Sequence, residues 1–347
     1  MAIQATKLES LFVAAGYSVL SVPTNCELPR SLQWVVTVPI LRTGVNVLVF
    51  FYSLRRASLQ ADAVYFLTGF FNFFWWVTFP ALLLFFMSGQ KVILSARGGG
   101  AGAFFDRYRI LLNPLMHRID LITTPSVFLQ QEFARSFGIR PEVVPNIADL
   151  KQFGFRLRSP LRPRLIVTRN LEAIYNVGCA IRAFARVRER YPDATLAVIG
   201  EGDERTMLES LASSLELGSS VIFYGSVPHD QIQAMYDETD IFINASNVDN
   251  LPGVILEAFA CGLPVVTTRA GGIPFMVEDK VTALLVDCDD CDALAARVCE
   301  LLEDPVLARR LSENGRLESH RYSPEQVLQR MVPMFERVIE GTRDGKG

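Results

Sequence analysis

From Arg164 onward, short apolar runs alternate with segments in which apolar residues recur at helical spacing. The apolar runs are RLIVTR, ATLAVIG, VIFYG, DIFINAS, LPVVTT and TALLV, and helical patterns lie between them at about 177–190, 203–214, 229–238 and 253–261. Apolar strands separated by helices are typical of a parallel sheet with helices on both faces. The pattern predicts a doubly wound α/β domain that binds a ligand beyond the carboxyl ends of its strands.

The first half of the chain shows the same rhythm more weakly, with strand candidates YSVLSV, AVYFL, KVILSA, DLITT and EVVPN. The periodicity lapses in PNIADLKQFGFRLRSPLRPR, where Pro and Arg gather as they do in linkers. We therefore expect two doubly wound, Rossmann-like domains that face each other across a cleft, the first over residues 1–147 and the second over 148–323.

The first predicted domain begins unusually. A sheet domain of this type normally opens with a strand and a glycine-rich turn, whereas Met1 leads into AIQATKLESLFVAAGYSV, which has the pattern of a helix followed by a strand. We expect that this domain lacks its N-terminal strand, either because the strand is lost or because the true start lies upstream.

An uncharged segment at 63–88, AVYFLTGFFNFFWWVTFPALLLFFMS, is long enough to span a bilayer. Gly69, Asn72 and Pro80 interrupt it, and it divides into a strand (63–67), a turn and an apolar helix (72–87). Pro and Asn are poorly placed for a simple spanning helix, which favours a buried strand and helix. The aromatic-rich helix could still touch a membrane surface without crossing it.

Charge and cysteine content narrow the class of protein. The net charge of −3 excludes a generally basic nucleic-acid binder, but residues 1–150 contain 12 Lys and Arg against 8 Asp and Glu, which favours an anionic surface or acceptor for this half. Six scattered cysteines and no signal peptide indicate reduced thiols in a cytosolic protein. The CxxC spacing of Cys288 and Cys291 has no second pair and no nearby His, so a coincidence of spacing is favoured over metal or redox use.

The segment NVDNLPGVILEAFACGLPVVTTRAGGIP, at 247–274, carries the chemistry. Pro252 suits the first turn of a helix whose free N–H groups would form an anion site for a phosphate. Glu257, about one turn into the helix, can accept two hydrogen bonds from a ribose diol, and Asp249 could accept a hydroxyl of a second sugar. Gly271 and Gly272 would let the backbone approach the ligand closely. These features suit a nucleoside-diphosphate sugar.

Structural explanations exist for each of these residues taken singly. Asp249 and Asn250 could cap a helix, and Glu257 could be a solvated helix residue. The segment GEGDER at 200–205 resembles part of a dinucleotide-binding motif, but it lacks the third Gly of GxGxxG and occurs in mid-chain, so a turn that leads into a helix explains it better than a dehydrogenase does.

Residues 143–322 resemble the C-terminal domain of GT-B glycosyltransferases, in particular the retaining glycosyltransferase family 4. The resemblance is carried by VVPNIADLKQF, VTRN, ATLAVIGEGDERTMLESLA, VIFYGSV and the segment at 247–274, with the spacing from Asp249 to Glu257 as its strongest element. Residues 1–142 resemble the acceptor domain of this family more loosely. The resemblance also implies that a last helix, at about 324–341, packs back on the first domain.

This resemblance implies a role for each matching residue. Glu257 would hold the ribose, Asp249 would contact the transferred sugar, and Arg169 would neutralise the departing diphosphate. Gly225 would lie near the nucleobase. The backbone of five consecutive residues would line the sugar and diphosphate: Asn250, Leu251, Pro252, Gly253 and Val254.

Three departures from the family pattern affect the expected site. Asp249 replaces the usual Glu. Tyr175 occupies the place of a Lys that usually follows the Arg, and a phenol can donate a hydrogen bond but cannot cancel charge. On the acceptor side, Arg97 followed by Gly98 and Gly99 stands where many members have a His, so Arg97 is either an electrostatic substitute or an ordinary loop arginine.

The resemblance implies a retaining transfer of sugar from a nucleoside-diphosphate sugar to a hydroxyl, without a metal, a cofactor or a catalytic His. The hydrophobic, slightly basic first domain suggests a sugar or lipid-linked acceptor in envelope or exopolysaccharide assembly, and a cytoplasmic protein with peripheral contact to the inner face of the membrane. Two alternatives remain open: a sugar-nucleotide epimerase of related fold, and a donor-binding protein without transferase activity. The sequence does not choose among UDP, GDP and ADP.

Overall fold

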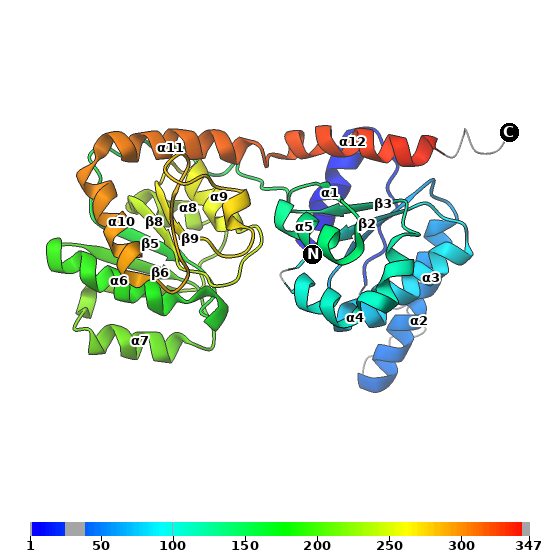
Figure 1. Ribbon diagram of the computed structural model, residues 1–347, viewed down its shortest axis with the longest axis horizontal. Coiled ribbons are helices and arrows are strands. Elements are labelled where there is room, and N and C mark those ends of the chain that lie inside the picture. The colour runs from blue at the N-terminus through cyan, green and yellow to red at the C-terminus, as the bar shows by residue number, and fades with distance from the viewer. Residues whose placement is uncertain (1, 25–38, 99, 342–347) are drawn as a thin grey trace. The chain divides into compact units, whose positions relative to one another are not determined.

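The computed structural model describes residues 2–24, 39–98 and 100–341, which fall into two compact units. Unit 1 comprises the described residues of 1–125, 130–144 and 328–347, and unit 2 comprises 126–129 and 145–327. Each unit contains one sheet in which all strand pairs are parallel (Figure 1).

Unit 1 has a four-stranded sheet in the order β1-β2-β3-β4. Its strands are β1 (Val64–Thr68), β2 (Val92–Ala96), β3 (Leu121–Thr124) and β4 (Glu142–Val143). Its helices are α1 (Ala2–Ala14), α2 (Pro39–Ser58), the π-helix η2 (Phe74–Thr78), α3 (Phe79–Met87), α4 (Ala101–Met116) and α5 (Val127–Phe137). All five residues of β2 are buried, which is expected of a central strand covered on both faces.

The uncharged segment at 63–88 folds as a strand, a turn and a helical stretch. The strand is β1, Phe71 in the turn has a φ of 53°, and η2 leads directly into α3, whose Ala81, Leu82 and Phe85 are buried. Within the described ranges, no helix combines the length and the apolar character needed to cross a bilayer.

The expected strand YSVLSV is wrong, because described residues 17–22 have no strand pairing. The apolar groups of this segment are used in another way. The Tyr17 ring packs edge-on against Phe12 of α1, with ring centroids 5.6 Å apart, and its hydroxyl donates to Glu336 Oε1 at 3.1 Å. The segment is therefore held by helices rather than by the sheet.

The last helix, α12 (Pro324–Glu340), contributes several of the contacts of unit 1. The Phe335 ring lies 4.8 Å from Phe12 and 5.3 Å from Tyr65, measured between ring centroids. Arg337 donates to Glu142 Oε1 at 3.1 Å. Residues from the C-terminal end of the chain thus pack against α1, β1 and β4.

Unit 2 has a six-stranded sheet in the order β10-β9-β8-β5-β6-β7. The strands are β5 (Arg164–Thr168), β6 (Thr195–Ile199), β7 (Val221–Gly225), β8 (Ile241–Asn244), β9 (Val265–Thr268) and β10 (Leu284–Val286). The α-helices are α6 (Val177–Arg190), α7 (Arg205–Ser214), α8 (Ile232–Glu238), α9 (Gly253–Ala260), α10 (Cys291–Glu303) and α11 (Pro305–His320). Short 3₁₀ turns are η3 (Ala173–Tyr175), η4 (Gly218–Ser220) and η5 (Ile273–Phe275).

The strand order of unit 2 reverses at β5. The chain moves outward from β5 to β6 and β7, and then returns to the other side of β5 to form β8. In such sheets, ligands bind at the carboxyl ends of the two strands where the order reverses. The loops that follow β5 and β8 are therefore the place to look for a site.

Local sequence signals explain where the helices begin. Asn176, with a φ of 46°, accepts the backbone N–H of Cys179 and starts α6. Asp304 accepts the N–H groups of Val306 and Leu307, and Pro305 occupies the first turn of α11.

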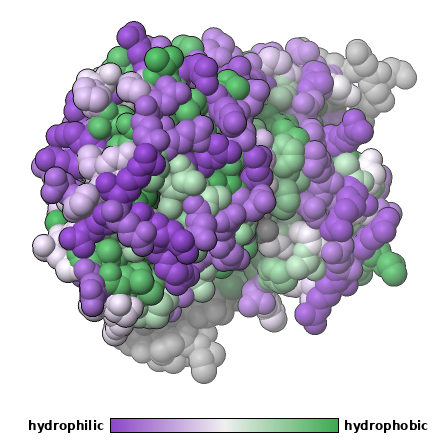
Figure 2. All heavy atoms as spheres, turned by 60° about the vertical axis from the view of Figure 1, so that its left-hand side comes forward, coloured by the Kyte–Doolittle hydropathy of each residue, from purple (hydrophilic) through white to green (hydrophobic). Residues whose placement is uncertain are grey.

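The side chains of unit 2 that come forward in Figure 2 are mainly hydrophilic, with hydrophobic residues interspersed.

Candidate functional site

Arg169 and Asp249 meet at the reversal of strand order in unit 2. Arg169 directly follows β5, and Asp249 lies in the loop after β8. The guanidinium Nη2 of Arg169 is paired with Asp249 Oδ2, and its Nε donates to Asn244 Oδ1 at 3.0 Å. The two charged side chains are only 10% and 12% exposed. The structure thus brings together the two residues predicted to carry catalysis.

Tyr175 contacts Arg169 through its ring. The Arg169 guanidinium carbon lies 4.9 Å from the centroid of the Tyr175 ring, within the range of a cation–π contact. The preceding residue fixes this turn, because the carbonyl of Ile174 accepts the N–H groups of Asn247 at 2.8 Å and Val248 at 3.3 Å. Tyr175 therefore supports the guanidinium from η3, while the loop after β8 is bound to the same turn.

Burial raises the pKa of Asp249, although the neighbouring Arg169 and the N–H of Asn250 act in the opposite direction. The N–H of Asn250 donates to Asp249 Oδ1 at 2.9 Å. Burial also raises the pKa of Tyr175, so its phenol stays neutral near pH 7. The Asp249 carboxylate is thus largely shielded from water, and the guanidinium of Arg169 lies beside it.

Gly271 and Gly272 lie against the backbone of the loop that carries Asp249, and their predicted approach to a ligand stays a prediction. A Cβ on Gly271 would lie 2.1 Å from the carbonyl oxygen of Asp249, and one on Gly272 would lie 1.9 Å from that of Asn250. The N–H of Gly272 also donates to the Asp249 carbonyl at 2.9 Å. The two glycines therefore make room for the backbone of the loop that carries Asp249.

Helix α9 begins as expected at Gly253, with Pro252 as its N-cap residue in an extended conformation. No side chain caps this end, so its first N–H groups are available to an anion. Leu251 and Val254 pack against the hydrophobic core of unit 2, which leaves their backbone rather than their side chains for a ligand. The predicted sugar and diphosphate segment, 250–254, is thus a helix start anchored by apolar side chains.

Glu257 is held by a partner that the sequence did not indicate. The hydroxyl of Tyr236, on α8, donates to Glu257 Oε2 at 3.0 Å and lies 3.0 Å from the Thr168 hydroxyl. Because the Tyr236 proton is committed to the carboxylate, the Thr168 hydroxyl donates to Tyr236. Complete burial and the nearby carboxylate raise the pKa of Tyr236 and keep it protonated. His229 Nε2 lies 3.9 Å from the other oxygen, Oε1.

Gly225 lies away from the Arg169 pair, at the end of the edge strand β7. Its carbonyl accepts the N–H of Gly200 at 2.8 Å, and a Cβ on it would lie 2.6 Å from Glu201 Oε1. Glu201 is in turn paired with Arg205. These contacts do not test the nucleobase role of Gly225, which stays a prediction.

The predicted acceptor residues belong to unit 1. Arg97 follows β2 and is buried, with its Nε donating to Ser95 Oγ at 3.1 Å and its N–H to the carbonyl of Thr68 at 2.8 Å. Gly98 has a φ of 126° and lies against Phe70. Gly99 is outside the described residues. The acceptor role of these residues stays a prediction.

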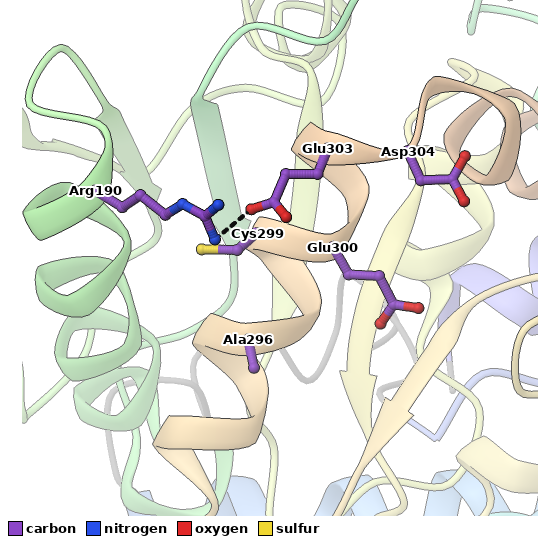
Figure 3. A pocket seen from close by; sticks show the side chains of 6 residues that line it. All are labelled: Arg190, Ala296, Cys299, Glu300, Glu303 and Asp304. Carbon is purple, nitrogen blue, oxygen red and sulfur yellow. Dashed lines mark ion pairs between the residues drawn. The ribbon is translucent and has the colours of Figure 1, made fainter.

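A surface hollow of about 460 Å³ lies on unit 2, apart from the residues discussed so far (Figure 3). It is lined by Arg190, Ala296, Cys299, Glu300, Glu303 and Asp304, and Arg190 is paired with Glu303 at 2.5 Å. None of the predicted site residues lines it. Within the described ranges, no group of three or more His, Cys, Asp and Glu side chains is placed to hold a metal ion.

One residue of the site could have been suspected from the sequence and two could not. Asn244 is a polar residue at the end of an apolar strand, which is a signal for a site at a strand terminus, and it accepts from Arg169. His229 precedes a predicted helix but has no distinctive spacing. Tyr236 resembles any buried aromatic residue of an amphipathic helix, so only the packing reveals its contact with Glu257.

Residues 156–318 match a family model described as glycosyl transferases group 1. The chain is 30% identical over 247 residues to a GDP-mannose-dependent α-(1-6)-phosphatidylinositol monomannoside mannosyltransferase of Mycolicibacterium smegmatis, covering 65% of each chain. It is 27% identical over 183 residues to N-acetyl-α-D-glucosaminyl L-malate synthase of Bacillus anthracis, covering 52% of this chain and 47% of that one. The chain thus spans less than two thirds of the length of both relatives.

Two solved structures resemble both units. Anabaena Alr3699/HepE in complex with UDP and glucose has a TM-score of 0.70 at 18% identity, over 96% of this chain and 94% of that one. A glycosyltransferase from Rickettsia africae has a TM-score of 0.69 at 14% identity, over 97% and 93%. Together with the two parallel-sheet units, this similarity shows that the chain has the GT-B fold, and its second unit contains the region that matches group 1 glycosyltransferases.

Proposed function

We propose that the protein is a retaining glycosyltransferase of family 4 that transfers a sugar from a nucleoside-diphosphate sugar to a hydroxyl acceptor. The observation that carries the proposal is the convergence of Arg169, Asp249 and the uncapped start of α9 where the strand order reverses, with Glu257 one turn further along the helix. In a nucleoside-diphosphate sugar, the diphosphate joins the ribose to the sugar. Arg169 and the start of α9 would meet the diphosphate, Glu257 the ribose and Asp249 the sugar.

In the proposed reaction, the N–H groups at the start of α9 and the guanidinium of Arg169 hold the diphosphate. The bond from the anomeric carbon to the diphosphate oxygen breaks, and a bond from the same carbon to the acceptor oxygen forms on the same face of the sugar. The proton of the acceptor hydroxyl passes to the departing diphosphate. Arg169 and the helix start stabilise the charge that develops on the leaving group, and the proposal assigns no step to a metal ion or a cofactor.

Asp249 and Glu257 would position the donor. Asp249 accepts a hydrogen bond from a hydroxyl of the transferred sugar. Glu257 accepts hydrogen bonds from the ribose diol, because its bond from Tyr236 uses only one of its lone pairs. Tyr175 adds no charge to the diphosphate site and acts through Arg169.

The similar proteins support a nucleotide sugar as donor. One relative is named a GDP-mannose-dependent enzyme, and the Anabaena structures contain UDP or UDP-glucose. The mycobacterial relative is named for a phosphatidylinositol glycolipid acceptor. We therefore propose a lipid-linked or membrane-proximal acceptor in envelope or exopolysaccharide assembly, and a cytoplasmic protein at the inner face of the membrane.

A thermal-shift titration with UDP, GDP and ADP tests the donor site. A nucleotide that binds only the folded protein must raise its melting temperature. We expect one of them to stabilise the native protein and to lose most of this effect with Glu257→Gln, whereas Glu238→Gln, an exposed glutamate on α8, should behave as the native protein. The absence of any shift with all three nucleotides would contradict the proposal.

Product analysis separates transfer from the alternatives. Incubation of the matching nucleotide sugar with hydroxyl acceptors should release the nucleoside diphosphate only when an acceptor is present. Release of the diphosphate without an acceptor would favour a sugar-nucleotide epimerase. Nucleotide binding without any turnover would favour a donor-binding protein without transferase activity.

A further inference from the structure

A stripe of apolar side chains lies exposed on η2 and α3 of unit 1. Trp76 is 76% exposed and Met87 is 88% exposed, and Leu83 between them is exposed as well. Their spacing of seven and four residues places them along one side of a helix. The opposite side is buried through Phe74, Leu82 and Phe85, so the helical stretch is apolar on both the covered side and the open side.

Helix α4 also exposes apolar side chains. Ile110 is 93% exposed, Leu111 is also exposed, and the exposed Arg107 and Arg109 flank them. A ring contact joins α4 to η2, because Trp75 lies 5.0 Å from Tyr108 between ring centroids. The guanidinium of Arg118, just beyond α4, lies 4.7 Å from the centroid of the Phe86 ring.

Helix α2 adds side chains of the same two kinds. Leu48 and Tyr52 of α2 are exposed, and so is Leu59, which directly follows the helix. Arg55 and Arg56, in the last turn of α2, are exposed as well. Helix α2 contacts α3. Figure 1 shows α2, α3 and α4 together on the side of unit 1 away from α12.

The charge of these helices is mainly positive. The sequences of α2, η2, α3 and α4 contain five arginines and one acidic residue, Asp106. The Asp106 carboxylate accepts from Arg135 at 3.1 Å, and Arg135 also donates to Glu132 of α5 at 2.9 Å, so the arginines of these helices outnumber the acidic groups beside them. Exposed apolar groups combined with an excess of positive charge match a bilayer that contains anionic lipids, and tryptophan and arginine are favoured at its headgroup level.

We propose that the surface formed by α2, η2, α3 and α4 docks on an anionic lipid bilayer, with Trp76, Met87 and Ile110 inserted among the headgroups and the arginines paired with lipid phosphates. This inference deepens the proposed function, because it specifies the surface by which the enzyme reaches a membrane-held acceptor. A protein partner is less well matched, because such an interface normally has polar groups of both charges around its apolar centre.

Flotation with lipid vesicles tests the docking surface. Vesicles of phosphatidylcholine alone are compared with vesicles that also contain phosphatidylglycerol. We expect the native protein to float with the anionic vesicles, less so at high salt. A combined Trp76→Ser, Met87→Ser and Ile110→Ser variant should bind them at least tenfold more weakly. The matched control is Val306→Ser with Leu317→Ser, two exposed apolar residues of unit 2, and it should float as the native protein does.

Nucleotide binding provides an independent readout. The serine variants should keep the melting-temperature shift produced by the nucleotide, since the donor site lies in unit 2, and this result would show that they are folded. Equal flotation of the native protein and the folded triple variant would overturn the inference, as would failure of the native protein to bind anionic vesicles. A native dimer that the triple variant dissociates, without any vesicle binding, would assign the surface to a second copy of the chain and also overturn it.

Discussion

The pairing of Arg169 with Asp249 has a consequence for nucleotide binding. Without a ligand, the Arg169 Nη2 donor is occupied by the carboxylate of Asp249, and its Nε donor is occupied by Asn244. A diphosphate that takes the Nη2 donor of Arg169 must displace the Asp249 carboxylate, and the charge of this carboxylate repels a diphosphate bound through any of the other guanidinium donors. We therefore predict that Asp249→Asn binds free UDP, or whichever diphosphate the titration selects, more tightly than the native protein while losing transfer activity.

The magnitude follows from the geometry of the pair. Hydrogen bonds to charged groups contribute about 1.5–3 kcal/mol, and both side chains are largely shielded from water. Asparagine keeps the size of the residue and removes its charge, so part of this amount, about 1.4 kcal/mol, is expected to appear as affinity, which corresponds to about tenfold tighter binding. Loss of the carboxylate that accepts the sugar hydroxyl should lower kcat by roughly 10²-fold, as for other single transition-state contacts.

Isothermal titration calorimetry with the nucleoside diphosphate measures the affinity, and initial rates with the nucleotide sugar measure transfer. Asp193→Asn, an exposed aspartate in the loop before β6, is the control and should change neither quantity. Weaker binding by Asp249→Asn would refute the reasoning. It would show that Asp249 orients the Arg169 guanidinium for the phosphate instead of competing with the phosphate for it.

The sequence was informative where function depends on residues that follow predicted strands. Because β5 and β8 are neighbours and parallel, the residues after them had to meet, and Arg169 and Asp249 do so. The start of α9 was also predictable, because a proline followed by an apolar helical pattern marks a helix N-terminus. Local rules and the strand order were sufficient for these features.

Features that depend on packing between distant segments could not be predicted. The sequence suggested that Gly271 and Gly272 bring backbone close to a ligand, whereas the space beside them is filled by carbonyl oxygens of the preceding loop. The sequence placed Tyr175 where the family has a lysine and predicted at most a hydrogen-bond donor there, and only the packing shows that its ring contacts Arg169. The segment YSVLSV has a strand pattern, yet Tyr17 is engaged by helices that come from opposite ends of the chain. In each case, a contact far along the sequence decides the role.

Four further predictions concern residues around the donor site. Tyr175→Phe should keep native nucleotide affinity, whereas Tyr175→Leu should weaken it by roughly the 0.5–2 kcal/mol of a cation–π contact, as calorimetry would show. Tyr236→Phe should lower the free energy of unfolding by about 1–3 kcal/mol in urea titrations, because the buried Thr168 hydroxyl and the partly buried Glu257 carboxylate lose their partner. Gly272→Ala should cost about 1–3 kcal/mol and impair nucleotide binding, since its Cβ would lie 1.9 Å from a carbonyl oxygen, whereas Gly154→Ala, whose nearest neighbour is 3.8 Å away, should do neither. The last prediction concerns pH. Burial raises the pKa of Asp249 in the folded protein, so ionising this residue costs more in the folded state than in the unfolded state, and stability is lost as pH rises through its folded-state pKa. Asp249→Asn cannot ionise, so it should melt at a higher temperature than the native protein at about pH 7, and the difference should shrink as the pH is lowered toward about 4. Thermal unfolding of both proteins across this range checks the sign, and a difference that widens on acidification would mean that the ion pair outweighs the cost of burying the carboxylate.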